Sequence, residues 1–356
     1  MAELFGRKMT KQELLERVGT IHQAAGVKKV RFADGAEEGV EACIFRTGSG
    51  LSFTVAAGRG MDIAHADWCG RSLGFLTSVG EISPQYYEPE EKGWLRSFFG
   101  GLLTTCGLTQ VGSPCEDNGQ KLGLHGRISN IPARNLHCGA EWQDDDYIFW
   151  AQGEMRETAF YGENLLLTRK IIAKLGENSI WINDTVENQA FETAPHMMLY
   201  HFNAGFPCVD AGSQIMLPTL SVTPRDHGYS EEGFDKVGAP TDGAAERVYY
   251  HEMQADSDGK VTAAIVNPNI GGGFGFYIRY NKNELPFFTE WKLEAKGRYV
   301  VGLEPGNCHV EGRVKESERG TLQTLSPGEK RCYSLEIGVI TSNRDLEQIL
   351  RQTKTR

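Results

Sequence analysis

The sequence has no excess of positive charge. Lysine and arginine together number 37, against 47 aspartate and glutamate residues, so the formal net charge is −10. Binding of nucleic acids and of anionic membrane surfaces depends on clustered lysine and arginine, and the composition therefore argues against both kinds of partner. A neutral or cationic small molecule is compatible with this charge, and one local arginine would still be enough to hold an anionic ligand.

Long apolar segments are missing as well. No apolar run has the length of a membrane span, and residues 1–9 lack the apolar core of a signal peptide. The eight cysteines are scattered along the chain, and no two of them form a Cys-x-x-Cys motif. These absences predict reduced thiols and a cytoplasmic protein.

Motifs for nucleotides and activated serines are absent too. There is no Walker sequence and no Gly-x-Ser-x-Gly elbow. The glycines of 271–275 resemble a phosphate loop, but the dinucleotide fingerprint needs a helix after the loop, and 276–280 has the pattern of a strand. Cys308, His309 and Glu311 are too few for a tetrahedral zinc site. The sequence therefore predicts no nucleotide cofactor and no metal.

What the sequence does contain is the pattern of many short strands. Glycine is abundant at 42 residues, and aromatic and β-branched runs lie between glycine-bearing turns. Apolar and polar residues alternate over 180–186, and 165–173 supplies a hairpin partner. Further strands are expected at 261–266, 274–280, 287–293, 299–303 and 333–340. We predict an all-β fold, a large antiparallel β-sandwich that occupies residues 1–356 as one domain.

Short helices are expected near both ends of the chain. Thr10 and Glu13 form a capping box, which predicts a helix within about residues 9–19. Ser342 is a cap ahead of an apolar stripe, which predicts a second helix over about 342–352. The long loop 224–247 is expected to cover a functional site, and a tolerated surface insertion is an equally good interpretation.

Glu304 and His201 are candidates for acid–base chemistry. Glu304 ends a strand on the same face as Gly302, which leaves room for a close approach. His201 shares a strand face with Asn203, and an imidazole titrates near neutral pH. The pattern alone also fits a solvated strand-end glutamate and a core histidine.

Two arginines are candidates for ligand binding. His125 and Arg127 flank a glycine and could form a donor pair for hydroxyls or an anion, or an ordinary turn. Arg59 and Asp62 have the spacing of a local ion pair, which competes with a role for Arg59 in substrate binding.

Taken in order, these stretches resemble the aldose 1-epimerase (galactose mutarotase-like) superfamily, and more closely its DUF4432 branch. The resemblance covers about residues 32–340 and rests on segments 58–63, 99–108, 124–126, 201–203, 291–292 and 299–307. It implies a galactose mutarotase-like supersandwich, a sugar ligand and acid–base opening and closing of the sugar ring without a cofactor. It also implies that His201 is the general acid and Glu304 the general base.

The same resemblance assigns the binding residues. It implies that His125 binds substrate, and Arg59, Asn203 and Trp291 lie in matched segments as further candidates. Arg127 replaces a glycine of the family pattern, so it is the candidate partner of an anionic sugar.

Alternatives to an isomerase remain open at this point. One is a carbohydrate-binding protein without turnover, and another is a lyase or hydrolase on the same sandwich. An inverting hydrolase would need a second carboxylate, for which Glu290 is the candidate. A homodimer is a further expectation.

Overall fold

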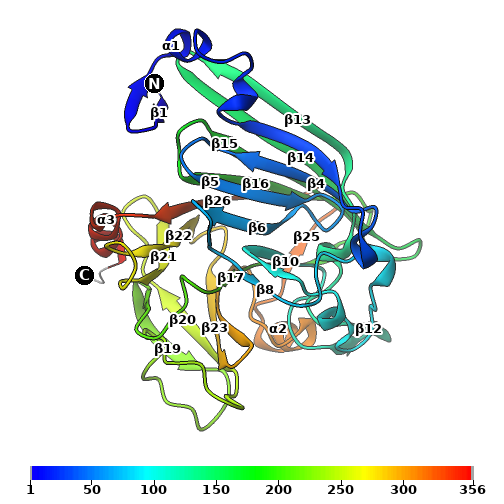
Figure 1. Cartoon of the computed structure of the whole chain (residues 1–356). Helices are drawn as coiled ribbons and strands as arrows, with labels where there is room; N and C mark the ends of the chain where they lie inside the picture. The colour runs from blue at the N-terminus through cyan, green and yellow to red at the C-terminus, as the bar shows by residue number, and fades with distance from the viewer. Residues whose placement is uncertain (1, 354–356) are drawn as a thin grey trace.

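The structure is a computed structural model and describes residues 2–353. Two large antiparallel sheets make up most of it (Figure 1). Within that range the larger sheet has twelve strands and the smaller one eight. The larger sheet has the order β19 (Thr219–Pro224), β20 (Arg247–Met253), β23 (Phe287–Ala295), β24 (Arg298–Gly306), β17 (Ala194–Ala204), β10 (Leu103–Leu108), β6 (Asp62–Trp68), β5 (Leu51–Ala56), β4 (Glu41–Arg46) and β3 (Gly26–Arg31), with β7 (Arg71–Ser72) beside β6 and β25 (Gln323–Leu325) beside β17.

The smaller sheet contains the longest hairpins. Its order is β13 (Arg134–Gln143), β14 (Asp146–Thr158), β15 (Asn164–Lys174), β16 (Ser179–Asn188), β26 (Lys330–Ile340), β22 (Phe274–Asn281), β21 (Lys260–Asn267) and β18 (Gln214–Met216). Within the described residues, three two-stranded sheets lie outside both large sheets: β1 (Ala2–Leu4) with β2 (Arg7–Met9), β8 (Phe75–Leu76) with β9 (Gly100–Gly101), and β11 (Cys115–Asp117) with β12 (Gln120–Leu122). The predicted all-β sandwich is confirmed, and each strand expected from the sequence is present.

The main hydrophobic core is built from side chains of both sheets. Along β14, β15 and β16, buried and half-buried residues alternate, as a strand with one face on a core requires. Phe45 of β4 stacks on Phe53 of β5 with ring centroids 4.5 Å apart, and Phe149 of β14 lies 5.9 Å from Phe45. The aromatic contacts therefore join the two sheets.

Residues 2–353 contain three α-helices, one near each end of this range and one after β24. The capping box of Thr10 and Glu13 is present at α1 (Lys11–Leu15), although this helix ends earlier than expected. The predicted C-terminal helix is α3 (Asn343–Thr353), which packs beside β21 and β22 (Figure 1). The sequence did not predict α2 (Arg313–Arg319), which begins at Gly312 without a side-chain cap.

Strand β17 separates the core from a second apolar cluster. Met198, Tyr200 and Phe202 point into the main core. Met197 and Leu199 point to the other face, where they pack with Trp94 and Phe98 among others. His201 lies on this second face by the alternation of the strand, and the candidate site is built there.

Candidate active site

His201 and Glu304 meet on neighbouring strands of the larger sheet. In the register of β17 and β24, Phe202 lies opposite Leu303 and Asn203 opposite Gly302. The Nε2 atom of His201 lies 3.1 Å from Oε1 of Glu304. The residues are only 5% and 2% exposed. The structure thus brings together the two residues to which the sequence assigned acid–base roles.

Both members of this pair keep a buried polar atom without a hydrogen-bond partner. Within residues 2–353, Nδ1 of His201 and Oε1 of Glu304 neither donate nor accept a hydrogen bond in favourable geometry. Leaving such atoms unsatisfied costs about 1–3 kcal/mol each. Unsatisfied polar atoms at the wall of a cavity are therefore positions where a bound ligand or water gains free energy.

Gly302 makes room for the carboxylate. A Cβ atom at position 302 would lie 2.4 Å from Oε1 of Glu304 and 3.1 Å from Cβ of Trp291. Trp291 lies directly opposite Gly302 in the register of β23 and β24. The close approach expected at Gly302 is thus made by the side chains of Glu304 and Trp291.

Aromatic rings surround the imidazole of His201. Its ring centroid lies 5.5 Å from Trp291, 5.9 Å from Phe98 and 5.8 Å from His125. Trp94 stacks on Phe98 at 4.8 Å and contacts the ring of His125 at 4.7 Å. These rings form apolar walls around one acid–base pair.

A cavity of about 230 Å³ opens beside this pair. His125, His201, Trp291 and Glu304, all predicted from the sequence, line it. The other lining residues are Lys92, Trp94, Leu95, Phe98, Gly112, Ser113, Pro114, Leu124, Arg225, Glu246, Val248, Thr289 and Val310. Four of the seven residues named as site candidates are therefore gathered in one place.

Three charged residues of the cavity wall, Lys92, Arg225 and Glu246, were not predicted. Arg225 and Glu246 lie at the two ends of the loop between β19 and β20, and Nη2 of Arg225 lies 3.1 Å from Oε1 of Glu246. The indole Nε1 of Trp291 donates to Oε2 of Glu246 at 3.2 Å. For Arg225 and Glu246 the length of the 224–247 loop was the only signal in the sequence, and the ends of that loop do reach the cavity.

The turn that carries His125 fixes its protonation pattern. His125 has a φ angle of 57°, so the backbone leaves the extended conformation at this residue. The backbone N–H of Gly112 donates to Nδ1 of His125 at 3.4 Å. The accepting role of Nδ1 leaves the proton of the neutral ring on Nε2.

Burial shifts the pKa values of the site in opposite directions. Burial lowers the pKa of His201 to about 4 and that of His125 to about 3, with the neighbouring His201 also acting on His125. Burial raises the pKa of Glu304 well above its ordinary value, and the charge of Arg225 partly opposes this rise. Over a wide pH range the His201–Glu304 pair therefore carries no net charge.

Arg127 does not reach this cavity, and its predicted place beside His125 is wrong. Its side chain is exposed and lines a different cavity. The period-two argument places residues i and i+2 on one face only in a strand, whereas residues 124–127 form a turn. Arg127 consequently points elsewhere.

Arg59 is also outside the cavity, and the ion pair predicted for it with Asp62 is wrong. Its guanidinium is fully buried and donates to the carbonyl oxygens of Ile82, Ser97 and Ser129 at 2.6–2.9 Å. Backbone carbonyls thus accept the hydrogen bonds of this guanidinium in place of the expected partner Asp62.

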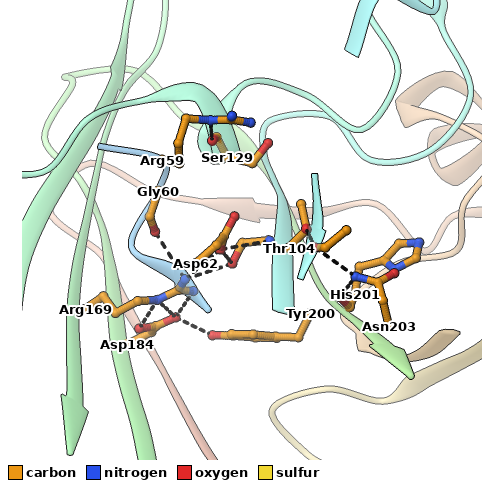
Figure 2. Close-up of polar contacts among 12 residues, drawn as sticks. Arg59, Gly60, Asp62, Thr104, Ser129, Arg169, Asp184, Tyr200, His201 and Asn203 are labelled. Carbon is orange, nitrogen blue, oxygen red and sulfur yellow. Dashed lines mark hydrogen bonds and ion pairs between the residues drawn. The ribbon is translucent and has the colours of Figure 1, made fainter. Parts of the chain in front are cut away.

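Asp62 belongs instead to a buried network behind the site (Figure 2). Nη1 of Arg169 lies 3.1 Å from Asp62, and Nη2 lies 2.7 Å from Asp184. The hydroxyl of Tyr200 donates to Asp184 at 2.7 Å. Tyr200 therefore connects the strand of His201 to this network.

Asn203 and Glu290 do not line the cavity either. Asn203 shares the face of His201, but its amide donates to the carbonyl oxygens of Gly100 at 3.3 Å and His201 at 3.0 Å. Glu290 lies on the face of β23 opposite Thr289 and Trp291, where His251 Nε2 is 3.4 Å from its Oε2. The carboxylate suggested for an inverting hydrolase thus points away from Glu304.

His309 does not form part of a metal cluster. Its Nδ1 atom contacts Oε1 of Glu316 at 3.0 Å. Across the described part of the chain, residues 2–353, no group of three or more histidine, cysteine, aspartate or glutamate side chains is arranged to hold a metal ion. In the same range, no helix is both long enough and apolar enough to cross a membrane.

The fold is shared with solved proteins of the galactose mutarotase type. A candidate aldose 1-epimerase from Klebsiella pneumoniae subsp. pneumoniae MGH 78578 is 24% identical with a TM-score of 0.87, over 92% of this chain and 86% of the other. A galactose 1-epimerase from Lactobacillus acidophilus NCFM is 12% identical with a TM-score of 0.55, over 89% of this chain and 99% of the other. A galactose mutarotase-like protein from Clostridium acetobutylicum is 11% identical with a TM-score of 0.59, over 89% and 99%. At these identities the likeness establishes the fold.

The family is established by the sequence itself. The model of DUF4432, a domain of unknown function, matches residues 37–339, so the chain belongs to the DUF4432 family. No functionally curated protein matches the sequence. The chemistry of the site therefore has to be argued from its own residues.

Proposed function

We propose that this protein is a sugar isomerase of the aldose 1-epimerase type, which interconverts the anomers of a free monosaccharide. One observation carries the proposal: His201 and Glu304 lie 3.1 Å apart at the wall of one small cavity, each with a buried polar atom left unsatisfied. The likeness in fold to candidate and named aldose 1-epimerases supports the same reaction class.

The pair supplies both proton transfers that ring opening requires. The pair reacts in the form in which its shared proton lies on His201, although burial favours the form with that proton on Glu304. In the reactive form Glu304, as a carboxylate, removes the proton of the C1 hydroxyl, while protonated His201 gives a proton to the ring oxygen. The C1–O5 bond breaks, and an aldehyde, a neutral imidazole and a carboxylic acid result. After rotation of the carbonyl group, the two residues reverse roles and the ring closes with either configuration. One proton moves between the residues, so the pair has no net charge before and after.

The remaining groups of the cavity suit sugar binding. Neutral His125 keeps its proton on Nε2, which serves as a donor for a substrate hydroxyl. Trp291 and Trp94 offer apolar faces for the C–H surface of a sugar ring. The cavity of about 230 Å³ is smaller than the roughly 300–1,000 Å³ common for drug-sized ligands. These features favour a monosaccharide over an oligosaccharide.

Anomer exchange measured by NMR over a panel of aldoses, ketoses, sugar acids and sugar phosphates tests the proposal. We expect accelerated exchange for at least one sugar, and a loss of about 100- to 10,000-fold in Glu304→Gln and in His201→Asn. Circular dichroism and thermal unfolding check that both variants fold. Saturable sugar binding without exchange would instead identify a binding protein, and an undiminished rate in either variant would mean that the acid–base pair is a different one.

The setting we propose is the cytoplasm. All eight cysteines are free thiols, which is the usual state in a reducing compartment. A small sugar is the proposed partner, and a homodimer, testable by light scattering, is the proposed assembly.

A further inference from the structure

A second cavity, of about 420 Å³, lies next to the turn that carries His125. His125 lines the first cavity and Arg127 lines this one, and Gly126 lies between these two residues in the sequence. The hydroxyl of Tyr87, which also lines the second cavity, donates to the carbonyl oxygen of Gly126 at 2.9 Å. The function proposed above makes no use of this second cavity.

Asn130, which lines the second cavity, has an unsatisfied polar atom. It is 6% exposed, and its Nδ2 donates to Oγ of Ser129 at 3.3 Å. Its Oδ1 atom has no hydrogen-bond partner among residues 2–353. A buried amide with a free acceptor favours a ligand that carries a hydroxyl or N–H donor.

Two guanidinium groups line the same cavity. The side chain of Arg127 makes no hydrogen bond or ion pair within the described residues, and only its backbone is hydrogen-bonded, to Gly107 and Asn130. Arg156 uses Nη1 to donate to Oδ1 of Asn164 at 2.6 Å and to Oε1 of Gln189 at 2.7 Å, which leaves its Nη2 and Nε atoms for a ligand. Arginine forks of this kind bind carboxylate and phosphate groups.

Two carboxylates in the wall restrict the ligand further. Glu157 is turned toward the protein, where it accepts the backbone N–H of Leu108 at 2.8 Å and the hydroxyl of Thr109 at 2.6 Å. Glu163 also lines the cavity and can accept hydrogen bonds from hydroxyl groups. Arginines beside acceptors of this kind match a molecule with one anionic group and several hydroxyls, and do not match an apolar ligand.

We propose that this second cavity is a binding site for a small polyhydroxylated organic anion, such as a sugar acid or a sugar phosphate. In this site Arg127 and Arg156 hold the anionic group, and Asn130 and Glu163 accept hydrogen bonds from hydroxyls. The site is separate from the acid–base pair, so binding here does not depend on turnover.

An NMR titration of backbone amide signals tests the site, with glucuronate and inorganic phosphate as separate probes. With glucuronate we expect saturable shifts that cluster in residues 127–131 and 156–163. The variant Arg127→Ala, whose side chain is exposed and so dispensable for folding, should bind about tenfold or more weakly through the loss of one charge-assisted contact. Arg298→Ala, which removes an exposed arginine of β24, is the matched control and should bind like the unaltered protein.

The outcomes separate the site from the alternatives. Shifts with glucuronate and not with phosphate would show that the hydroxyl groups take part in recognition, as proposed. Equal shifts with both probes would show an anion site that does not recognise hydroxyl groups, contrary to the proposal. Binding that survives in Arg127→Ala, or shifts confined to residues around His201 and Arg225, would overturn it. Absence of saturable shifts with glucuronate would also overturn it. Because the readout is binding, failure of the isomerase proposal leaves this result unaffected.

Discussion

Gly302 and Glu304 are joined by a steric relationship on β24: the carboxylate of Glu304 occupies the space that a side chain at position 302 would fill. A Cβ atom there would lie 2.4 Å from Oε1, which is far inside van der Waals contact. The end of a glutamate side chain can move away, so the added methyl group is expected to displace the carboxylate from His201 while the strand stays intact.

Gly302→Ala is therefore predicted to lower the rate of anomer exchange without unfolding the protein. We expect kcat to fall about tenfold or more, since catalysis depends on the positioning of reacting groups to within about 1 Å, while KM changes little. Gly19→Ala is the matched control, because its Cβ would meet no atom within 4 Å. A kcat equal to that of the control would show that the position of the carboxylate is not limiting.

The pH dependence of kcat/KM should be bell-shaped, with limbs set by the His201–Glu304 pair. Burial lowers the pKa of His201 to about 4, so below about pH 4 a second proton enters the pair and Glu304 can no longer act as a base. Burial raises the pKa of Glu304 well above its ordinary value, and above that raised pKa the pair loses its shared proton and the acid is missing. Anomer exchange measured from pH 3 to pH 10 tests this, and a rate that is flat over the whole range would contradict it.

Arg225 and Glu246 should move the alkaline limb in opposite directions. The charge of Arg225 lowers the pKa of Glu304 and that of Glu246 raises it. Arg225→Gln is therefore expected to shift the alkaline limb to higher pH, and Glu246→Gln to lower pH. The two variants serve as controls for each other, since each breaks the same ion pair at 3.1 Å. Shifts of the same sign would show that loss of the ion pair, and not the charge near Glu304, governs the profile.

Removal of Arg169 should destabilise the fold strongly. Arg169→Leu leaves Asp62 and Asp184 buried without their shared cation, and breaking such an arrangement costs about 3–5 kcal/mol. Tyr200→Phe removes only the hydrogen bond to Asp184 and should cost about 1.5–3 kcal/mol, with anomer exchange retained. Urea unfolding followed by fluorescence measures both, and an equal loss in the two variants would contradict the central role of the arginine.

The sequence predicted the elements whose patterns are local. The alternation of apolar and polar residues in β16 and β22 is a property of a few consecutive residues, and the capping box at α1 spans four residues. Helix α2 was missed because its buried residues, Arg313 and Glu316, are charged. Arg313 is satisfied by partners far along the chain, such as Asp117, which no local pattern reveals.

The site was predicted only where strand geometry or a recognised motif carried the information. His201 and Glu304 sit on strand faces that period-two reasoning orients correctly. Arg127 was misplaced because a positive φ at His125 breaks that period. Arg225 and Glu246 were missed because their pairing depends on how the ends of a long loop close, which no short pattern encodes.

The turn around Gly126 contributes one residue to each of the two cavities, His125 to the first and Arg127 to the second. A Cβ at this position would lie 2.4 Å from the carbonyl oxygen of Gly107 and 2.5 Å from that of Gln110, and the φ angle is 73°, so a larger residue would push the whole turn aside. A substitution that changes the shape of one cavity by moving this turn therefore also changes the shape of the other. The ligand preference of one cavity can therefore change without the other only through lining residues outside this turn. Those residues are the positions at which to engineer the specificity of either cavity.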